Sequence, residues 1–213
     1  MTTEIRKEYK VVYDNNKKNS NEIFNIRSTL KTLYPPRKIA SLYMDTIDLK
    51  IYRDSQLSDV NKFKLRFRQY DNKSSIQKEI KMNTELGRKK IIENTNYENL
   101  DDIMPLYFKS MSLFPIVKIS FLREYYYKKN LRVTVDTDLV AKTSSFFDLN
   151  ESVFVSNKNV VEFKLKNTLY KNNFLSKLTI NDELSIEDKI NLTPVSFSKY
   201  THSVENLINS SKF

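Results

Sequence analysis

The chain has 213 residues and a formal net charge of +10. This length suits one domain with a sizeable core, and the charge favours an anionic partner such as a phosphate compound, a nucleic acid or a membrane surface. Cysteine is absent and Gly87 is the single glycine, which excludes disulfides, thiolate metal sites and glycine-rich phosphate loops, so any phosphate must be held by side chains.

The N-terminal quarter predicts a strand, a helix and a second strand. Residues 4–13 have the period of two that is typical of a strand: one face carries Arg6, Glu8 and Lys10, and the other carries Lys7, Tyr9 and Val11. A helix follows over 19–33, where apolar side chains recur at helical spacing, and Pro35-Pro36 end it. Residues 38–44 predict the second strand, and residues 45–53 predict a short helix.

The most informative stretch is 62–70, because its charge alternates strictly. The cationic even positions are Lys62, Lys64, Arg66 and Arg68, and the apolar odd positions are Phe63, Leu65 and Phe67. A period of two places these sets on opposite faces of one strand. A lone strand of this kind would simply expose its basic face to water, but other predicted strands carry charge on one face in the same way.

The middle of the chain continues as strands with one interruption. Residues 76–82 and 88–93 predict a hairpin that turns at the single glycine, and residues 99–111 predict a helix interrupted by proline. Residues 114–128 predict a long strand. Arg123 falls on its apolar parity, so either a bulge shifts the register or this arginine lies in a drier environment.

The last part predicts strands over 131–136 and 159–166, and mostly helix over 167–213. About eight strands, mostly antiparallel, predict an α+β fold with a closed or nearly closed barrel and flanking helices. We expect the helices to cover the apolar faces from outside and the charged faces to line a central tunnel. The lysine and arginine side chains in such a tunnel would repel one another unless the tunnel held a multiply charged anion.

Eight short motifs follow one another along nearly the whole chain. They are Arg6-Lys-Glu-Tyr-Lys10, Ser41-Leu-Tyr-Met-Asp-Thr46, Lys64-Leu-Arg-Phe-Arg-Gln-Tyr70, Glu79-Ile-Lys81, Phe121-Leu-Arg123, Leu131-Arg-Val-Thr-Val-Asp136, Val161-Glu-Phe-Lys164 and Phe197-Ser-Lys-Tyr200. Together they resemble the VTC domain, the polyphosphate polymerase branch of the CYTH-like triphosphate tunnel metalloenzymes. Phe121 stands where that family often has a tyrosine, which removes one hydroxyl.

The resemblance implies a single domain over 1–213, built as an eight-stranded tunnel. It would transfer the terminal phosphoryl group of ATP to a growing polyphosphate chain with Mn²⁺ or Mg²⁺. The residues implied for phosphate binding are Lys10, Arg66, Arg68, Lys81, Arg123, Arg132, Lys164, Ser198 and Lys199. Those implied as catalytic are Arg66, Arg68, Arg123, Arg132 and Lys199. Glu162 is the implied metal ligand, with Glu8 and Glu79 as further candidates.

Two other functions stay open. Tunnel-fold hydrolases commonly carry Glu-x-Glu-x-Lys on the first strand, and Arg6 takes the place of the first carboxylate here, which favours the polymerase over a triphosphatase or polyphosphatase. A non-catalytic binder of polyphosphate or nucleic acid is the third alternative, since basic strands interleaved with Phe67 and Tyr70 can bind single strands. The glutamates on those faces speak against specific nucleic-acid binding.

The remaining assignments are structural. Lys62, Lys64, Lys78 and Lys118 are assigned to solvated strand faces, and His202 to a packing position on a helix. No apolar run suits a signal peptide or a membrane span, so we expect a cytoplasmic protein. A membrane-protein partner and the oligomeric state stay open.

Overall fold

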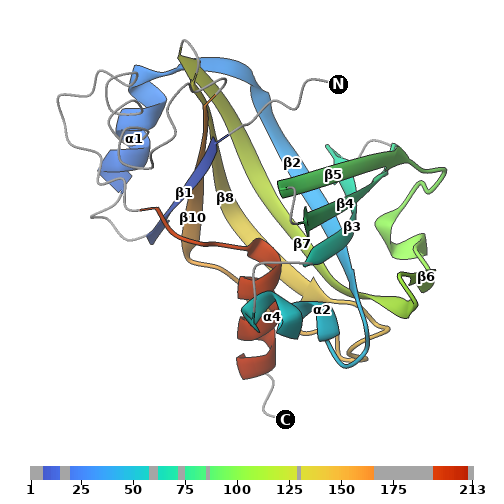
Figure 1. Ribbon diagram of the computed structural model, residues 1–213. Helices are drawn as coiled ribbons and strands as arrows, with labels where there is room; N and C mark the ends of the chain where they lie inside the picture. Colours follow the sequence, from blue (N-terminus) through green and yellow to red (C-terminus); the bar gives the residue numbers. More distant parts are fainter. Residues whose placement is uncertain are drawn as a thin grey trace. The chain divides into compact units, whose positions relative to one another are not determined.

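A computed structural model describes residues 7–14, 20–57, 62–71, 75–84, 87–128, 131–165 and 194–210 (Figure 1). The strands are β1 (Lys7–Asp14), β2 (Lys31–Asp45), β3 (Phe63–Tyr70), β4 (Gln77–Thr84), β5 (Gly87–Asn94), β6 (Leu106–Phe108), β7 (Met111–Lys128), β8 (Leu131–Thr143), β9 (Val153–Val155) and β10 (Lys158–Leu165). The helices are α1 (Ser20–Thr29), α2 (Lys50–Leu57), the 3₁₀ helix η1 (Leu100–Asp102) and α4 (Lys199–Ser210).

The strands form one sheet of ten strands in the order β1-β10-β8-β7-β2-β3-β4-β5, with β6 added to β7 and β9 added to β8. Pairing is antiparallel from β1 through β10 to β8 and from β2 through β3 and β4 to β5. The α+β prediction is confirmed as a mostly antiparallel sheet with few helices. Among the described residues the hydrogen-bonded order begins at β1 and ends at β5, so the sheet is not closed into the expected barrel.

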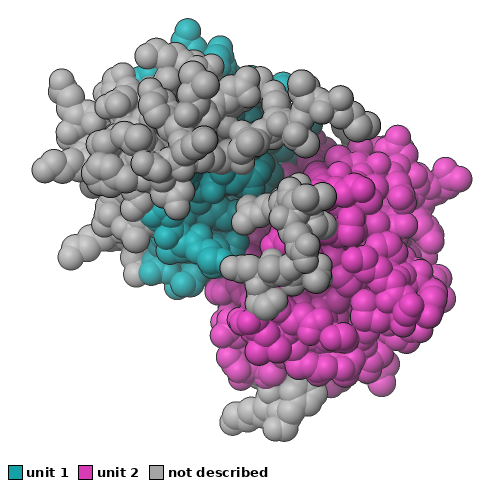
Figure 2. All heavy atoms as spheres, viewed as in Figure 1, with its two compact units in different colours: residues 1–37, 122–138, 157–197 teal, residues 38–121, 139–156, 198–213 magenta. Residues whose placement is uncertain are grey.

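The chain divides into two compact units (Figure 2). Unit 1 contains residues 1–37, 122–138 and 157–197, and unit 2 contains residues 38–121, 139–156 and 198–213. The boundaries fall inside β2, β7 and β8, so each of these long strands contributes residues to both units.

In unit 1, α1 packs on the apolar face of the strands. Ile23, Ile26 and Leu30 are buried in one cluster with the odd-numbered residues of β1, including Val11. The same cluster contains Phe163 and the odd residues of β8. The expected covering of an apolar face by the first helix is confirmed, and it leaves the even-numbered residues on the other face of the strands.

In unit 2, the strands β2 to β4 bury their apolar face against the segment around η1. Leu42, Leu65 and Ile80 share a cluster with Leu100 and Ile103. A second cluster holds the apolar residues Tyr200, Val204 and Leu207 of α4, which lies beside α2 (Figure 1). No helix in the described part of the chain is both long and apolar enough to cross a membrane.

Two sequence predictions about local structure are wrong. The segment 99–111 forms only the short η1 before it becomes β6, which joins β7 through Lys109 and Ser110, both with positive φ. That turn lacks the glycine or asparagine that usually marks such a hairpin. Pro35-Pro36 do not end a helix either: α1 ends at Thr29, and β2 runs through the two prolines where the strand is mostly exposed.

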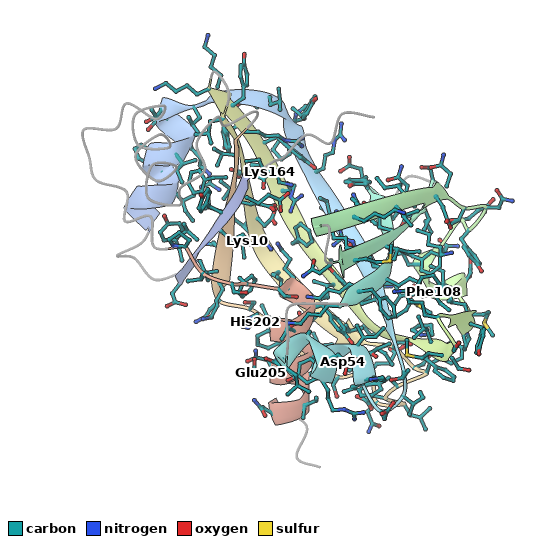
Figure 3. The ribbon with its side chains drawn as sticks, in the orientation of Figure 1. Lys10, Asp54, Phe108, Lys164, His202 and Glu205 are labelled. Atoms are coloured by element: carbon teal, nitrogen blue, oxygen red, sulfur yellow. The ribbon has the colours of Figure 1, made fainter. Side chains whose placement is uncertain are left out.

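His202 has the packing role that the sequence predicts. It lies on α4 (Figure 3). Its ring meets Phe154 edge-on, and its Nε2 lies 3.1 Å from the Oγ of Ser156. The predicted helical segment 167–213 is confirmed for α4, and its parts from 167 to 193 and from 211 to 213 lie outside the described residues.

Candidate functional site

A basic face runs across β3 and β4 of unit 2. The register places Lys64 opposite Lys81, Arg66 opposite Glu79, and Lys81 in turn opposite Lys90 of β5. The neighbouring residues in each strand point into the apolar cluster described above. The predicted separation of a cationic and an apolar face in 62–70 is therefore confirmed within this unit.

The carboxylate of Glu79 is the centre of this face, with only 1% of its side chain exposed. Its Oε2 accepts hydrogen bonds from the Nε of Arg66, at 2.8 Å, and from the Nη2 of Arg66. Its Oε1 accepts one from the Nζ of Lys90 at 2.7 Å, and the Nη1 of Arg68 lies 3.9 Å from its Oε2. Three cations therefore share one buried carboxylate.

These contacts fix the charge of the cluster. Burial would raise the pKa of Glu79, but Arg66, Arg68 and Lys90 outweigh it and lower that pKa to about 2. Burial and the neighbouring charge of Arg66 both lower the pKa of Arg68. Two buried guanidinium groups that repel each other are held together by the carboxylate between them.

Tyr43 of β2 forms the other contact of Arg66. Its hydroxyl accepts a hydrogen bond from the Nη1 of Arg66 at 2.8 Å, and its ring stacks on Tyr200 with centroids 5.0 Å apart. Burial would raise the pKa of Tyr43, but the charges of Arg66 and Arg68 lower it to about 7. Next to it, Ser41 Oγ accepts a hydrogen bond from the Nε of Arg68 at 3.1 Å.

The start of α4 lies beside the same face. Ser198 caps the helix, because its Oγ accepts the Thr201 N–H at 3.3 Å, and it also accepts the Nζ of Lys64 at 2.7 Å. Lys199 places its Nζ 4.6 Å from the ring centroid of Phe121. The phenylalanine that replaces the family's usual tyrosine thus contacts a cation that the sequence assigns to the site.

One buried carboxylate anchors both helices of unit 2. Asp45, at the end of β2, accepts the hydroxyl of Tyr200 from α4 and the backbone N–H groups of Ile51 and Tyr52, each at 2.8 Å, from α2. Burial raises the pKa of Asp45 even though these hydrogen bonds oppose the shift. Because Tyr200 also stacks on Tyr43, this anchor fixes the start of α4 next to Arg66.

Unit 1 carries a second charged face on β1, β10 and β8. Lys10 pairs in register with Glu162, and Glu8 pairs with Lys164. Lys10 and Lys164 are labelled in Figure 3. The Nζ of Lys164 lies 3.1 Å from Glu8 Oε1 and 3.6 Å from Glu162 Oε1. The Nζ of Lys10 donates to the carbonyl of Phe197 at 2.9 Å.

The two arginines of unit 1 differ in environment. Arg123 pairs with the buried Asp136, with Nη2 to Oδ2 at 2.7 Å and a second contact from Nε. Burial lowers the pKa of Arg123, but Asp136 and Glu162 outweigh it and raise that pKa. Arg123 is thus in the drier environment that was one of the two predicted alternatives. Arg132 is exposed, with its guanidinium 5.6 Å from the ring centroid of Tyr125.

The VTC domain family model matches residues 1–104 and 85–208. The chain belongs to the VTC domain family. A search of curated proteins found no match to this VTC domain.

Solved structures with the same fold share little sequence with this VTC domain. A putative adenylate cyclase from Bacillus halodurans has a TM-score of 0.53 at 12% identity, covering 92% of this chain and 93% of that one. One from Vibrio parahaemolyticus has a TM-score of 0.52 at 11% identity, covering 96% and 99%. A putative adenylyl cyclase from Hippeastrum, described as having a dominant triphosphatase activity, has a TM-score of 0.50 at 13% identity, covering 95% and 96%.

The predicted site residues of the VTC domain divide between the two units. Unit 2 brings together Arg66, Arg68, Lys81, Glu79, Ser198 and Lys199. Unit 1 brings together Lys10, Glu8, Glu162, Lys164, Arg123 and Arg132. That both sets line one tunnel stays a prediction.

Sequence reasoning missed four residues of the unit 2 cluster. Tyr43 and Ser41 share the parity of a strand for which we predicted no charged face, and Lys90 enters the cluster through the register of β4 and β5. Lys64 was assigned to solvent, yet it contacts Ser198. Its parity with Arg66 in 62–70 was the signal that could have placed it correctly.

The glutamates differ in how well they suit a divalent metal. The described residues contain no group of three or more metal-binding side chains. Glu8 and Glu162 contact the same ammonium of Lys164, so the two carboxylates would be close enough to hold one divalent ion together with a phosphate. One or two carboxylates plus substrate phosphates is the ligand set that Mg²⁺ usually has in phosphate enzymes. Glu79 suits a metal poorly, because three cations already share it.

Proposed function

We propose that this VTC domain is a metal-dependent polyphosphate polymerase that transfers the terminal phosphoryl group of ATP to a growing polyphosphate chain. Membership of the VTC family is the observation that carries the proposal. The basic faces of both units support it, because each presents lysine and arginine from neighbouring strands. In the proposal the protein acts in the cytoplasm on ATP and polyphosphate or inorganic phosphate.

The chemistry requires positioned cations more than a proton acceptor. An oxygen of the acceptor phosphate forms a bond to the γ-phosphorus while the bond from that phosphorus to the β-phosphate oxygen breaks, and ADP leaves. The attacking oxygen is already ionised, so no histidine is needed. The negative charge that the donor and acceptor phosphates share during the transfer would be neutralised by cationic side chains. These are Arg66, Arg68, Arg123, Arg132 and Lys199.

Glu162, with Glu8 beside it, would hold Mn²⁺ or Mg²⁺. The ion supplies charge neutralisation across adjacent phosphate oxygens. Lys164 contacts both carboxylates, and its ammonium would contact a phosphate oxygen instead when the ion binds.

The direct test is to incubate the purified protein with ATP and Mn²⁺ and to separate the products on a polyphosphate gel. We expect chains that lengthen with time and one ADP released for each phosphoryl group incorporated. Release of free phosphate only, with no chains, would overturn the polymerase proposal.

A triphosphatase on the same fold is the second candidate. The observation that favours it is the likeness to the Hippeastrum protein described as having a dominant triphosphatase activity. The same incubation distinguishes the two candidates, because a triphosphatase would release one inorganic phosphate for each ADP and would leave no polyphosphate chains on the gel. Supplying inorganic triphosphate in place of ATP extends the comparison, since a triphosphatase would cleave it without needing an acceptor.

A further inference from the structure

We propose that Glu79 and Tyr43 are positioning residues that hold the Arg66 guanidinium ready for a phosphate chain, and that Glu79 is not a metal ligand. This inference rests on the proposed function, because it names the role of two residues in the same phosphate-binding site. It replaces the expectation that Glu79 helps to bind Mn²⁺ or Mg²⁺.

The geometry around Arg66 fixes the plane of its guanidinium group. Glu79 accepts from Nε and Nη2 on one edge, and the Tyr43 hydroxyl accepts from Nη1. Arginine has five N–H groups, and these bonds to described residues use three of them. Two N–H groups remain with a fixed direction, which is the arrangement needed to bind two oxygens of a phosphate.

Glu79 and Tyr43 together form a clamp on Arg66, and this clamp is itself rigid. Glu79 is 1% exposed, and its other oxygen is held by Lys90. Tyr43 is held by stacking on Tyr200, which is tied to Asp45. Neither partner of Arg66 can turn away without breaking contacts of its own, so the guanidinium loses little further freedom when a phosphate binds.

The direction in which Glu79→Gln changes the affinity for a polyanion distinguishes a positioning role of Glu79 from a purely electrostatic one. Glu79 carries a negative charge beside three cations, so its removal should strengthen anion binding if only charge mattered. If Glu79 positions Arg66, the Glu79→Gln variant should bind a polyanion more weakly, because the arginine loses its fixed orientation. The two accounts predict opposite changes in the same measurement.

The probe is inorganic tripolyphosphate, titrated by calorimetry into the metal-free protein at fixed ionic strength. We expect Glu79→Gln to weaken its binding about tenfold, as for the loss of one charge-assisted interaction. The matched control is Glu93→Gln: Glu93 pairs with Lys78 at 3.0 Å on the same two strands, β4 and β5, but on their other face. It should leave the affinity within about twofold of wild type.

The Arg66→Gln background tests whether Glu79 acts through Arg66. In that background the further change Glu79→Gln should no longer weaken tripolyphosphate binding, because the group to be positioned is gone. Equal effects of Glu79→Gln with and without Arg66, or tighter binding in the single variant, would overturn the inference. So would an unchanged metal-free affinity combined with a higher Mn²⁺ requirement, which would make Glu79 a metal ligand.

Tyr43→Phe keeps the test possible if Glu79→Gln does not fold. It retains the ring that stacks on Tyr200 and removes only the hydroxyl that Arg66 contacts. We expect tripolyphosphate binding several-fold weaker than wild type, and no effect in the Arg66→Gln background. An unchanged affinity in Tyr43→Phe would refute its part of the clamp.

The two proposals fail in distinguishable ways. If wild-type protein makes no polyphosphate but Glu79→Gln still weakens tripolyphosphate binding through Arg66, the polymerase proposal fails and the clamp stands. If polyphosphate is made normally and Glu79→Gln changes tripolyphosphate affinity equally with and without Arg66, the clamp proposal fails and the polymerase proposal stands.

Discussion

Asp136→Asn should destabilise the protein strongly, because it leaves the Arg123 guanidinium without its buried counter-charge. The carboxylate is 2% exposed and the arginine side chain 15%. Removing one partner of a buried ion pair costs about 3–5 kcal/mol. The charge of Glu162 also favours charged Arg123, so we take the lower end, about 3 kcal/mol.

Urea unfolding followed by circular dichroism measures this loss. With a slope of about 2 kcal/mol per molar urea, the midpoint should fall by about 1.5 M. The control is Glu151→Gln, which removes the exposed pair between Lys142 and Glu151 and should cost less than about 1 kcal/mol. A loss below about 1 kcal/mol in Asp136→Asn would refute the view that this pair is a buried charge that needs its partner.

Three further predictions concern the site. Tyr43 has a pKa of about 7 in the folded protein against 10.0 ordinarily, so the unfolded state binds more protons than the folded state between these pH values. The free energy of unfolding of wild type, relative to that of Tyr43→Phe, should therefore rise by up to about 1.4 kcal/mol per pH unit from pH 7 to 10. Urea unfolding of both proteins at several pH values measures this difference, and a difference that does not change with pH would contradict the prediction. Arg132→Ala should abolish turnover with an unchanged thermal midpoint, because Arg132 is exposed, and wild-type turnover would remove it from the site. Glu162→Gln should raise the Mn²⁺ concentration for half-maximal turnover about tenfold or more, whereas an unchanged requirement would exclude it as a ligand.

The strands with strict alternation were predictable from the sequence. In 62–70 a period of two, with cations on one face, leaves a single register that buries Phe63, Leu65 and Phe67, and the structure has it. The first helix was predictable for the same reason, since Ile23 and Ile26 can be buried together only on a helix.

The parts that could not be predicted depend on tertiary contacts. The turn at Lys109 and Ser110 adopts positive φ without glycine, so only the pairing of β6 with β7 reveals it. Of the site, the charged residues could be named, but not their partners. That Glu79 binds Arg66 and Lys90 at once depends on the register of three strands, and no spacing within one strand carries that information.

The shared carboxylate of Asp45 links two distant positions of the chain, but it does not make them equally sensitive to replacement. It satisfies the N-terminus of α2 and the hydroxyl of Tyr200 at the same time, 155 residues away in the chain. An apolar side chain at Asp45 would leave the Tyr200 hydroxyl and the N–H groups of Ile51 and Tyr52 without their acceptor in a dry environment. Tyr200→Phe would remove only one of the donors to that carboxylate, so Tyr200 should tolerate replacement better than Asp45.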